Sequence, residues 1–314
     1  MATSLTKRGL LAASDKLILA ARPALEVIKD FTLDLSDDAV KPGTGVVVDV
    51  VTSTAENFVK STNNYKHATG TVKPVIVPVN IRKKSTFSLD DVDAIDDETS
   101  FLWDKFGPAA GRAVGGAIIQ GVTGLLTRTA RETATHTLGG TTLADFFAMR
   151  AFIEKQGIDP STVVALLEPT TYSNLCSVLN AGIVGDGSVV RGAIIGAALG
   201  FKSVYSAPTI STDSAAANDG KGKGFLVPEN AIAIANRVVK PIKGVVGGTI
   251  EYGTFTDEVS GITLSERVVY DSGDGECFWT SEGLFGAKLT KLDADGNADG
   301  NATGAPGYFQ VVVS

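Results

Sequence analysis

The chain has 314 residues, of which 44% are hydrophobic and 20% are charged, a composition too apolar for an intrinsically disordered protein. Its formal net charge of −7 argues against nucleic-acid binding as the main function, because duplex binding relies on clustered Lys and Arg. The only two cysteines exclude a disulfide framework and a zinc site built on cysteine pairs. A folded protein with a sizeable core is therefore expected.

Neither a membrane span nor an export signal is predicted. The longest apolar window, residues 109–126, contains Arg112, Gln120 and five glycines, which are costly in a hydrocarbon core. The apolar run at the N-terminus is interrupted by Asp15, unlike that of a secretory signal. The window is interpreted as a helix packed inside a folded protein, and no membrane partner is expected.

The first predicted element is an amphipathic helix near the N-terminus, broken near Pro23. Apolar residues fall on one helical stripe, namely Leu10, Leu17, Ala21, Leu25 and Ile28. Two interpretations stay open: a first helix that packs on its own domain, and an arm that lies on a neighbouring subunit.

A long β-hairpin is predicted next. Residues 46–52 form a β-branched run, and residues 71–81 alternate with a period of two after a polar stretch. Pro74 and Pro78 are four apart, so in a strand both missing N–H groups face the same lateral edge, which cannot donate to a further strand. The hairpin should therefore be a two-stranded ribbon. Since isolated ribbons are marginally stable, it needs a surface to lie against, and another subunit is a candidate for that surface.

Opposite charges follow the hairpin. Arg82-Lys83-Lys84 is followed by an acidic stretch at residues 90–98, which is explained either by solvated charge at an element boundary or by charges that meet on neighbouring subunits. The acidic stretch also favours a helix start. We expect a long helix from there to about Glu132, with a break at Gly107-Pro108, whose many glycines suit close packing of another backbone.

The rest of the chain divides into an α/β part and a β part. The α/β part has predicted helices at 143–156, 170–179 and 231–236 and strands at 162–167 and 201–205. The closing part has short strands at 249–254, 262–270, 277–279, 286–291 and 308–313. The fold class is therefore α+β.

No catalytic, cofactor-binding or metal-ligating residue is assigned. His67 and His136 have no ligand pattern around them and are interpreted as surface residues. Cys176 lies in an apolar helix, where a thiol usually acts as a small hydrophobe, and no Gly-x-Ser-x-Gly motif occurs.

Two further segments invite a ligand interpretation. The glycine cluster 182–192 lacks the third glycine of a dinucleotide fingerprint and the Gly-Lys-Ser/Thr of a nucleotide-triphosphate loop, so a flexible loop is preferred. The alternating residues Asp293, Asp295, Asn297 and Asp299 suggest an acidic hairpin tip, with bound calcium as the alternative. Residues 271–314 hold seven acids against two lysines, which predicts an acidic surface.

The order of these elements resembles the major capsid proteins of tailed bacteriophages, which have the Hong Kong 97 fold. The resemblance covers nearly the whole chain and rests on short sequence patterns more than on catalytic motifs. These are residues 165–175 (ALLEPTTYSNL), the run 192–206 with GAIIG and GFKSVYS, and the closing patterns 261–265 (GITLS) and 284–289 (LFGAKL).

The resemblance implies five regions. These are an N-terminal arm (1–43), an extended β-hairpin loop (44–92), the spine helix of a peripheral domain (93–138), an axial α/β domain (139–240) and the C-terminal β part of the peripheral domain (241–314). Some relatives crosslink a loop lysine to a neighbour's asparagine; Lys60 and Lys66 lie in that region, but this chemistry is not assigned to them.

The resemblance also implies a structural protein with no enzymatic activity and no cofactor. It would assemble as hexamers and pentamers into an icosahedral shell around phage double-stranded DNA, held without sequence-specific binding. Its location would be the virion capsid, assembled in the host bacterial cytoplasm, with separate scaffolding and portal proteins as partners. The alternatives are an encapsulin-type bacterial compartment and a cytosolic α/β enzyme that binds a ligand at 182–192.

Overall fold

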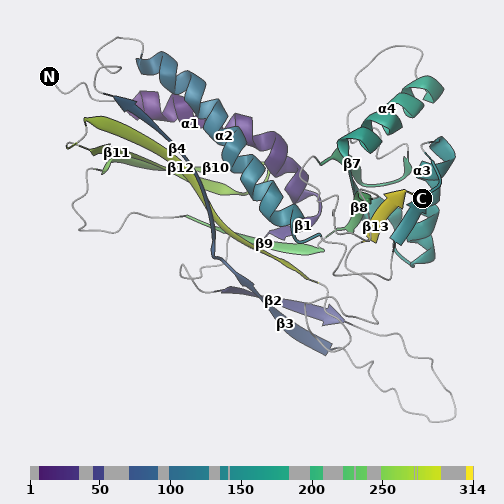
Figure 1. Cartoon of the computed structure of the whole chain (residues 1–314). Coiled ribbons are helices and arrows are strands. Elements are labelled where there is room, and N and C mark those ends of the chain that lie inside the picture. The colour runs from purple at the N-terminus through teal and green to yellow at the C-terminus, as the bar shows by residue number, and fades with distance from the viewer. Residues whose placement is uncertain are drawn as a thin grey trace.

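The computed structural model has two bodies and a projecting ribbon (Figure 1). The structure describes residues 7–34, 45–52, 71–90, 99–126, 135–140, 142–183, 199–207, 222–229, 231–238, 249–271, 273, 275–290 and 309–313.

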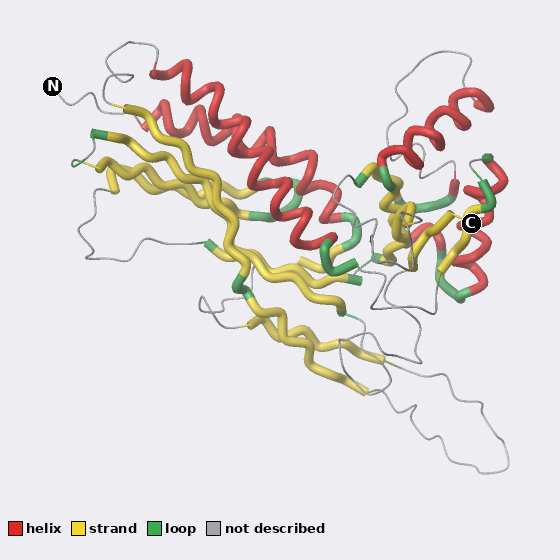
Figure 2. The backbone as a smooth tube through the Cα atoms, viewed as in Figure 1, coloured by secondary structure: helices red, strands yellow, loops and turns green. Residues whose placement is uncertain are grey.

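The larger body is a six-stranded sheet covered on one face by two helices (Figures 1 and 2). The helices are α1 (Lys7–Lys29) and α2 (Thr99–Thr123). The strand order is β1 (Thr32–Asp34), β9 (Ile232–Arg237), β12 (Glu276–Leu289), β11 (Thr263–Asp271) and β10 (Thr249–Thr256), and β4 (Ile81–Asp90) pairs with the other edge of β12. β12 is long enough to pair with β11 and then β9 along one edge.

The smaller body is a five-stranded sheet with two helices. Its strand order is β5 (Thr135–Leu138), β13 (Phe309–Val313), β8 (Gly222–Pro228), β6 (Val163–Leu167) and β7 (Ser203–Ser206), and its helices are α3 (Leu143–Lys155) and α4 (Pro169–Ile183), with a 3₁₀ turn at Pro160–Thr162. All five residues of β6 are buried, alternately in a core shared with the larger body and in one formed with α3 and α4. This two-sided burial explains why β6 reads as a continuous apolar run.

The predicted apolar stripe of the first helix is confirmed where its side chains are described. Leu17, Ala21, Leu25 and Ile28 are buried against α2 and the sheet, so the helix packs on its own body, the first of the two interpretations. The predicted break near Pro23 is wrong, because α1 continues through it. Pro23 is exposed, and the buried residues on either side of it hold the helix in place.

A long central helix is confirmed over Thr99–Thr123, although it ends before the predicted Glu132. Its predicted break at Gly107-Pro108 is wrong, because α2 runs through Pro108. Its glycines do allow close packing of another backbone. A Cβ on Gly111 would lie 2.2 Å from the carbonyl oxygen of Leu17, and one on Gly115 would lie 3.1 Å from that of Ala21. Glycine is therefore required at 111 for α1 and α2 to approach this closely.

The segment 231–236, predicted as a short helix, is strand β9. Alternating Ile and Ala suit either structure, and tertiary context decided the outcome: β9 lies between β1 and β12 with Ile232 to Asn236 all buried. The two strands predicted at 277–279 and 286–291 are one continuous strand, β12. Gly283 and Gly286 lie inside that strand, and at Gly286 the carbonyl oxygen of Pro78 comes too close for a side chain.

Further differences concern strands. Four strands are additional to the predicted elements, namely β1, β4, β5 and β8. β13 was expected with the closing strands but joins the five-stranded sheet, between β5 and β8. A strand position within a sheet depends on long-range pairing, which local pattern does not report.

Candidate functional site

The reactive side chains among the described residues do not come together in an active site. No cluster of three or more His, Cys, Asp or Glu residues that suits a metal occurs among them. Cys176 in α4 is partly buried against the core of the smaller body, and Cys277 in β12 is partly buried against that of the larger. Both thiols therefore pack as small hydrophobes.

His136, predicted as a surface residue, is half-buried in β5, and this prediction is corrected. Its ring lies 5.3 Å from that of Phe152, and its Nε2 is buried without a hydrogen-bond partner among the described residues. Burial lowers the pKa of His136 below its usual 6.5, although the nearby Asp145 carboxylate acts in the opposite direction. The cause of the burial is the packing of α3 on β5.

We expect His136 to make stability depend on pH. Its folded-state pKa lies below 6.5, so as pH falls through 6.5 the unfolded chain takes up a proton that the folded state resists, and stability decreases. The free energy of unfolding, measured by urea denaturation from pH 8 to pH 5.5, should fall less in His136→Gln than in the natural chain. Equal pH dependence in the two proteins, with both folded at pH 8, would contradict this assignment.

Several predicted segments lie outside the described residues. These are His67, Lys60 and Lys66 in the hairpin, most of the glycine cluster at 184–192, and the acidic positions Asp293 to Asp299. The acidic hairpin tip, its calcium alternative and the flexible glycine loop stay predictions.

The most distinctive feature is the ribbon, formed by β2 (Gly45–Thr52) and β3 (Thr71–Pro78), which projects from the larger body below β9 and β12 (Figure 1). It is an antiparallel two-stranded sheet, as predicted. Pro74 and Pro78 lie opposite Asp49 and Gly45, positions of the same parity along the ladder. Because proline cannot donate, these are the positions whose N–H would face away from β2, so the outer edge of β3 is blunted.

The base of the ribbon is fixed against the larger body. Val77 and Val79 are buried, whereas the side chain of Ile76 is 56% exposed. A Cβ on Gly286 of β12 would lie 2.0 Å from the carbonyl oxygen of Pro78, so the chain crosses β12 in direct contact with its backbone. The ribbon is therefore held to β12 at its base, and Ile76 beside that base is left exposed.

A buried ion cluster lies immediately after this base. Glu282 of β12 has a side chain only 1% exposed and accepts from Arg82 of β4, with Nε to Oε2 at 2.7 Å, and from Arg267 of β11. The cluster ties β4, which continues from the ribbon, to the two central strands. Two arginines satisfy both oxygens of one carboxylate, which is the arrangement in which a buried charge is tolerated.

A second polar cluster joins the two bodies. The Asp30 carboxylate, just after α1, accepts from the Ser203 hydroxyl at 2.8 Å and the Tyr205 hydroxyl at 2.6 Å, and Lys202 Nζ donates to the Asp30 carbonyl at 2.9 Å. Burial, together with Asp30, raises the pKa of Tyr205 to about 12, so its phenol stays a donor at neutral pH. With Phe31 buried in the shared core, this junction fixes β7 to the end of α1.

The fold is similar to that of solved phage structures. The capsid structure of the cyanophage P-SCSP1u matches 91% of this chain and 87% of its own, with a TM-score of 0.53 and 12% identity. A structure from Mycobacterium phage Adephagia matches 92% and 90%, with a TM-score of 0.52 and 14% identity. A structure from Microbacterium phage Oxtober96 matches 92% and 90%, with a TM-score of 0.52 and 12% identity.

At these identities the likeness is one of fold, and at that level it confirms the resemblance to phage capsid proteins seen in the sequence. No protein-family model matches the chain, and no curated protein matches its sequence. Within the described part of the chain, no helix has the length and apolar character that crossing a lipid bilayer requires.

Proposed function

We propose that the chain is a major capsid protein that self-assembles into an icosahedral shell enclosing the double-stranded DNA genome of a phage. The observation that carries this proposal is the likeness of 91% of the chain to 87% of a structure described as a phage capsid. The projecting ribbon suits a structural role in which copies of the chain contact one another.

The Hong Kong 97 division of the chain is part of this proposal. Residues 1–43 would be the arm, 44–92 the extended loop, 93–138 the spine, 139–240 the axial domain and 241–314 the rest of the peripheral domain. In this division the smaller body corresponds to the axial domain, with β5 and β13 added from outside its boundaries, and β9 lies in the larger sheet.

The partners follow from the same proposal. Copies of the chain would form hexamers and pentamers, and scaffolding and portal proteins would be separate chains. The net charge of −7 suits a wall that contains DNA without gripping it. The virion would be its location, with assembly in the bacterial cytoplasm. The comparisons do not favour the encapsulin or enzyme alternatives.

The proposal is tested by electron microscopy of the purified protein at high concentration, where closed particles are expected. For the ribbon, we expect deletion of residues 56–70 to leave a soluble, folded subunit that no longer forms closed shells. The reason is that β3 contacts β9 and β12 of its own body, with Val77 and Val79 buried at the base, and that the exposed Ile76 is available for contacts between subunits.

A point variant tests the contact surface of the ribbon without changing its length. Ile76→Asp, at an exposed position, should retain the circular dichroism spectrum of the natural chain while reducing the yield of particles. Unaltered particles from both variants would show that the ribbon does not join subunits, and particles filled with an enzyme in place of nucleic acid would favour the bacterial compartment.

A further inference from the structure

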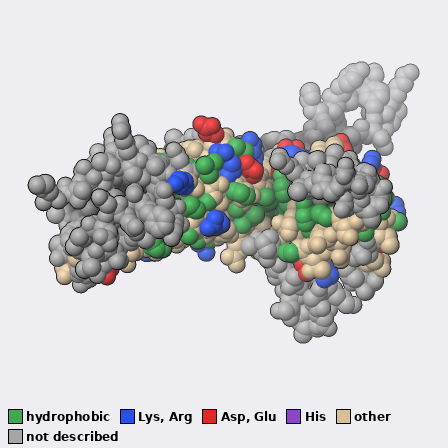
Figure 3. Space-filling model, turned by 90° about the horizontal axis from the view of Figure 1, so that it is seen from above, with side chains coloured by type: hydrophobic (Ala, Val, Ile, Leu, Met, Phe, Trp, Pro, Cys, Tyr) green, Lys and Arg blue, Asp and Glu red, His purple; other side chains and the backbone are tan. Residues whose placement is uncertain are grey.

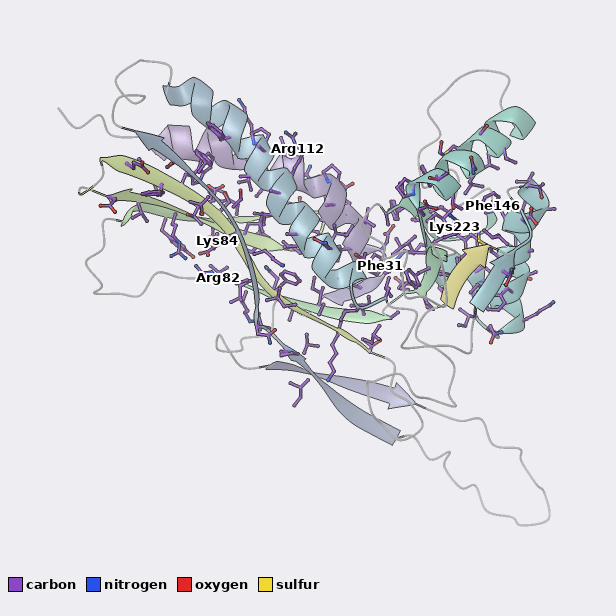
Figure 4. The ribbon with its side chains drawn as sticks, in the orientation of Figure 1. Phe31, Arg82, Lys84, Arg112, Phe146 and Lys223 are labelled. Atoms are coloured by element: carbon purple, nitrogen blue, oxygen red, sulfur yellow. The ribbon has the colours of Figure 1, made fainter. Side chains whose placement is uncertain are left out.

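The sheet of the larger body has one face that no helix of the described chain covers. The face toward α2 carries Phe87, whose ring stacks at 4.7 Å on Phe106 of α2. Side chains alternate along a strand, so Arg82, Lys84 and Thr86 of β4 project from the opposite face, and all three are exposed. We call this opposite face the open face; Figure 4 labels Arg82 and Lys84 on β4 and Arg112 on the helix side.

One end of the open face is basic. Arg82 of β4 and Arg237 of β9 flank Leu284 on its two sides, and Lys84 lies opposite Glu282. With Arg267, this end of the face carries four basic side chains, and the Glu282 carboxylate is already satisfied by its ion pairs with Arg82 and Arg267. The Lys84 ammonium is exposed and has no ion-pair partner among the described residues.

The other end of the same face is acidic. Glu276 of β12 lies opposite Asp271 of β11 on one side and opposite Asp90 of β4 on the other. Asp271 is exposed and Glu276 is half-buried. Like charges at directly opposed positions destabilise a sheet, so the pair Asp271 and Glu276 is an unfavourable arrangement in an isolated chain.

The two ends cannot neutralise each other within one chain. Positions 276 and 282 are six residues apart on β12, which corresponds to about 20 Å at about 3.3 Å per residue. On the coloured part of the surface seen from above in Figure 3, basic, acidic and apolar side chains lie close together.

We propose that copies of this chain associate head to tail through the open face, with the basic end around Lys84 in one copy meeting the acidic end at Asp271 and Glu276 in the next. The inference rests on the proposed function and identifies one of its contacts. Charge complementarity identifies the occupant as a second copy, since the same chain supplies both signs. In this head-to-tail arrangement each copy uses its basic end for one neighbour and its acidic end for another, so the contact is heterologous and generates rings when its rotation closes.

A zero-length carbodiimide, which links an amine to a carboxylate in direct contact, tests this pairing. In assembled particles made from a mixture of ¹⁴N and ¹⁵N subunits, mass spectrometry should find Lys84 joined to Asp271 or Glu276 in peptides of mixed isotope. The same link should be absent from dissociated subunits, because the groups lie about 20 Å apart within a chain. Particles that react at other lysines but never at this pair would overturn the proposal.

A double-mutant cycle provides the second readout. Lys84→Gln and Glu276→Gln should each raise the critical concentration for particle assembly about two- to fivefold, as expected for a partly exposed ion pair. The combined variant should raise it no further than either change alone, since both remove the same contact. Lys155→Gln, at an exposed position of α3, is the matched control and should assemble as the natural chain does.

The outcomes separate this inference from the proposed function. Closed particles from the natural chain, with additive effects in the cycle or none, would overturn the open-face contact and leave the capsid role standing. A natural chain that stays monomeric at high concentration would overturn both. Assembly that weakens with added salt in the natural chain but not in Lys84→Gln would support the pairing.

Discussion

Replacing Gly111 with alanine should destabilise the protein by about 2–3 kcal/mol, whereas the same change at Gly116 in the same helix should stabilise it by about 0.5–1 kcal/mol. A Cβ on Gly111 would lie 2.2 Å from the carbonyl oxygen of Leu17, a backbone atom that moves only if α1 moves. A Cβ on Gly116 would have no neighbour within 4 Å, so alanine there only improves helix propensity.

Urea denaturation of the two variants and the natural chain, followed by circular dichroism, measures this difference. Gly116→Ala is the matched control, because it makes the same chemical change in α2 without meeting α1. Equal stabilities of the two variants would mean that α1 does not pack closely on α2, and the helical layer of the larger body would have to be revised.

The buried carboxylate should have an effect of similar size. Glu282→Gln is expected to lower the free energy of unfolding by about 3 kcal/mol, because it leaves two arginines without the charge that compensates them. This value is at the low end of the range for breaking a buried ion pair, since the Arg82 side chain is 48% exposed and water screens part of its charge.

An exposed ion pair in the same protein supplies the control. Glu154 pairs with Arg150 at 2.9 Å one helical turn away, with both side chains about half exposed. Glu154→Gln should therefore change the stability by less than about 0.5 kcal/mol under the same denaturation conditions. If both substitutions lower the free energy of unfolding by the same amount, the ion pairs of Glu282 do not stabilise the attachment of β4 to the sheet.

The sequence predicts the elements whose pattern is local. The α1 stripe and the ribbon were predictable because amphipathic periodicity and paired prolines report on residues close in sequence. The closely packed glycines of α2 were also interpretable, since a long helix with that many glycines would be weak without a partner backbone.

The elements that were missed depend on distant residues. β9 is a strand because β1 and β12 pair with it, and its alternating Ile and Ala do not distinguish strand from helix. Gly283 and Gly286 have the composition of a turn, but they lie in β12 where α2 side chains and the Pro78 backbone approach the sheet. The charges of β4 suggested a boundary, although charge is also typical of an exposed edge strand.

The charged residues around Glu282 and the half-buried His136 also depend on residues that are distant in the sequence. Arg82 and Lys84 form a basic run in the sequence. Their positions beside Glu282 and Arg267 depend on the register of β4 and β11 with β12. Arg82 and Glu282 are 200 residues apart in the chain, so no local pattern predicts that they meet. The half-burial of His136 likewise follows from the packing of α3, which no spacing around the histidine reports.

The position of β13 has a consequence for biosynthesis. Residues 309–313 lie between β5 and β8, so two inner edges of the smaller sheet stay open until the ribosome has released these residues. Up to that moment the nascent chain exposes unpaired strand edges, and a product truncated before residue 309 would carry them permanently. The smaller sheet is therefore complete only in polypeptides that extend through this strand.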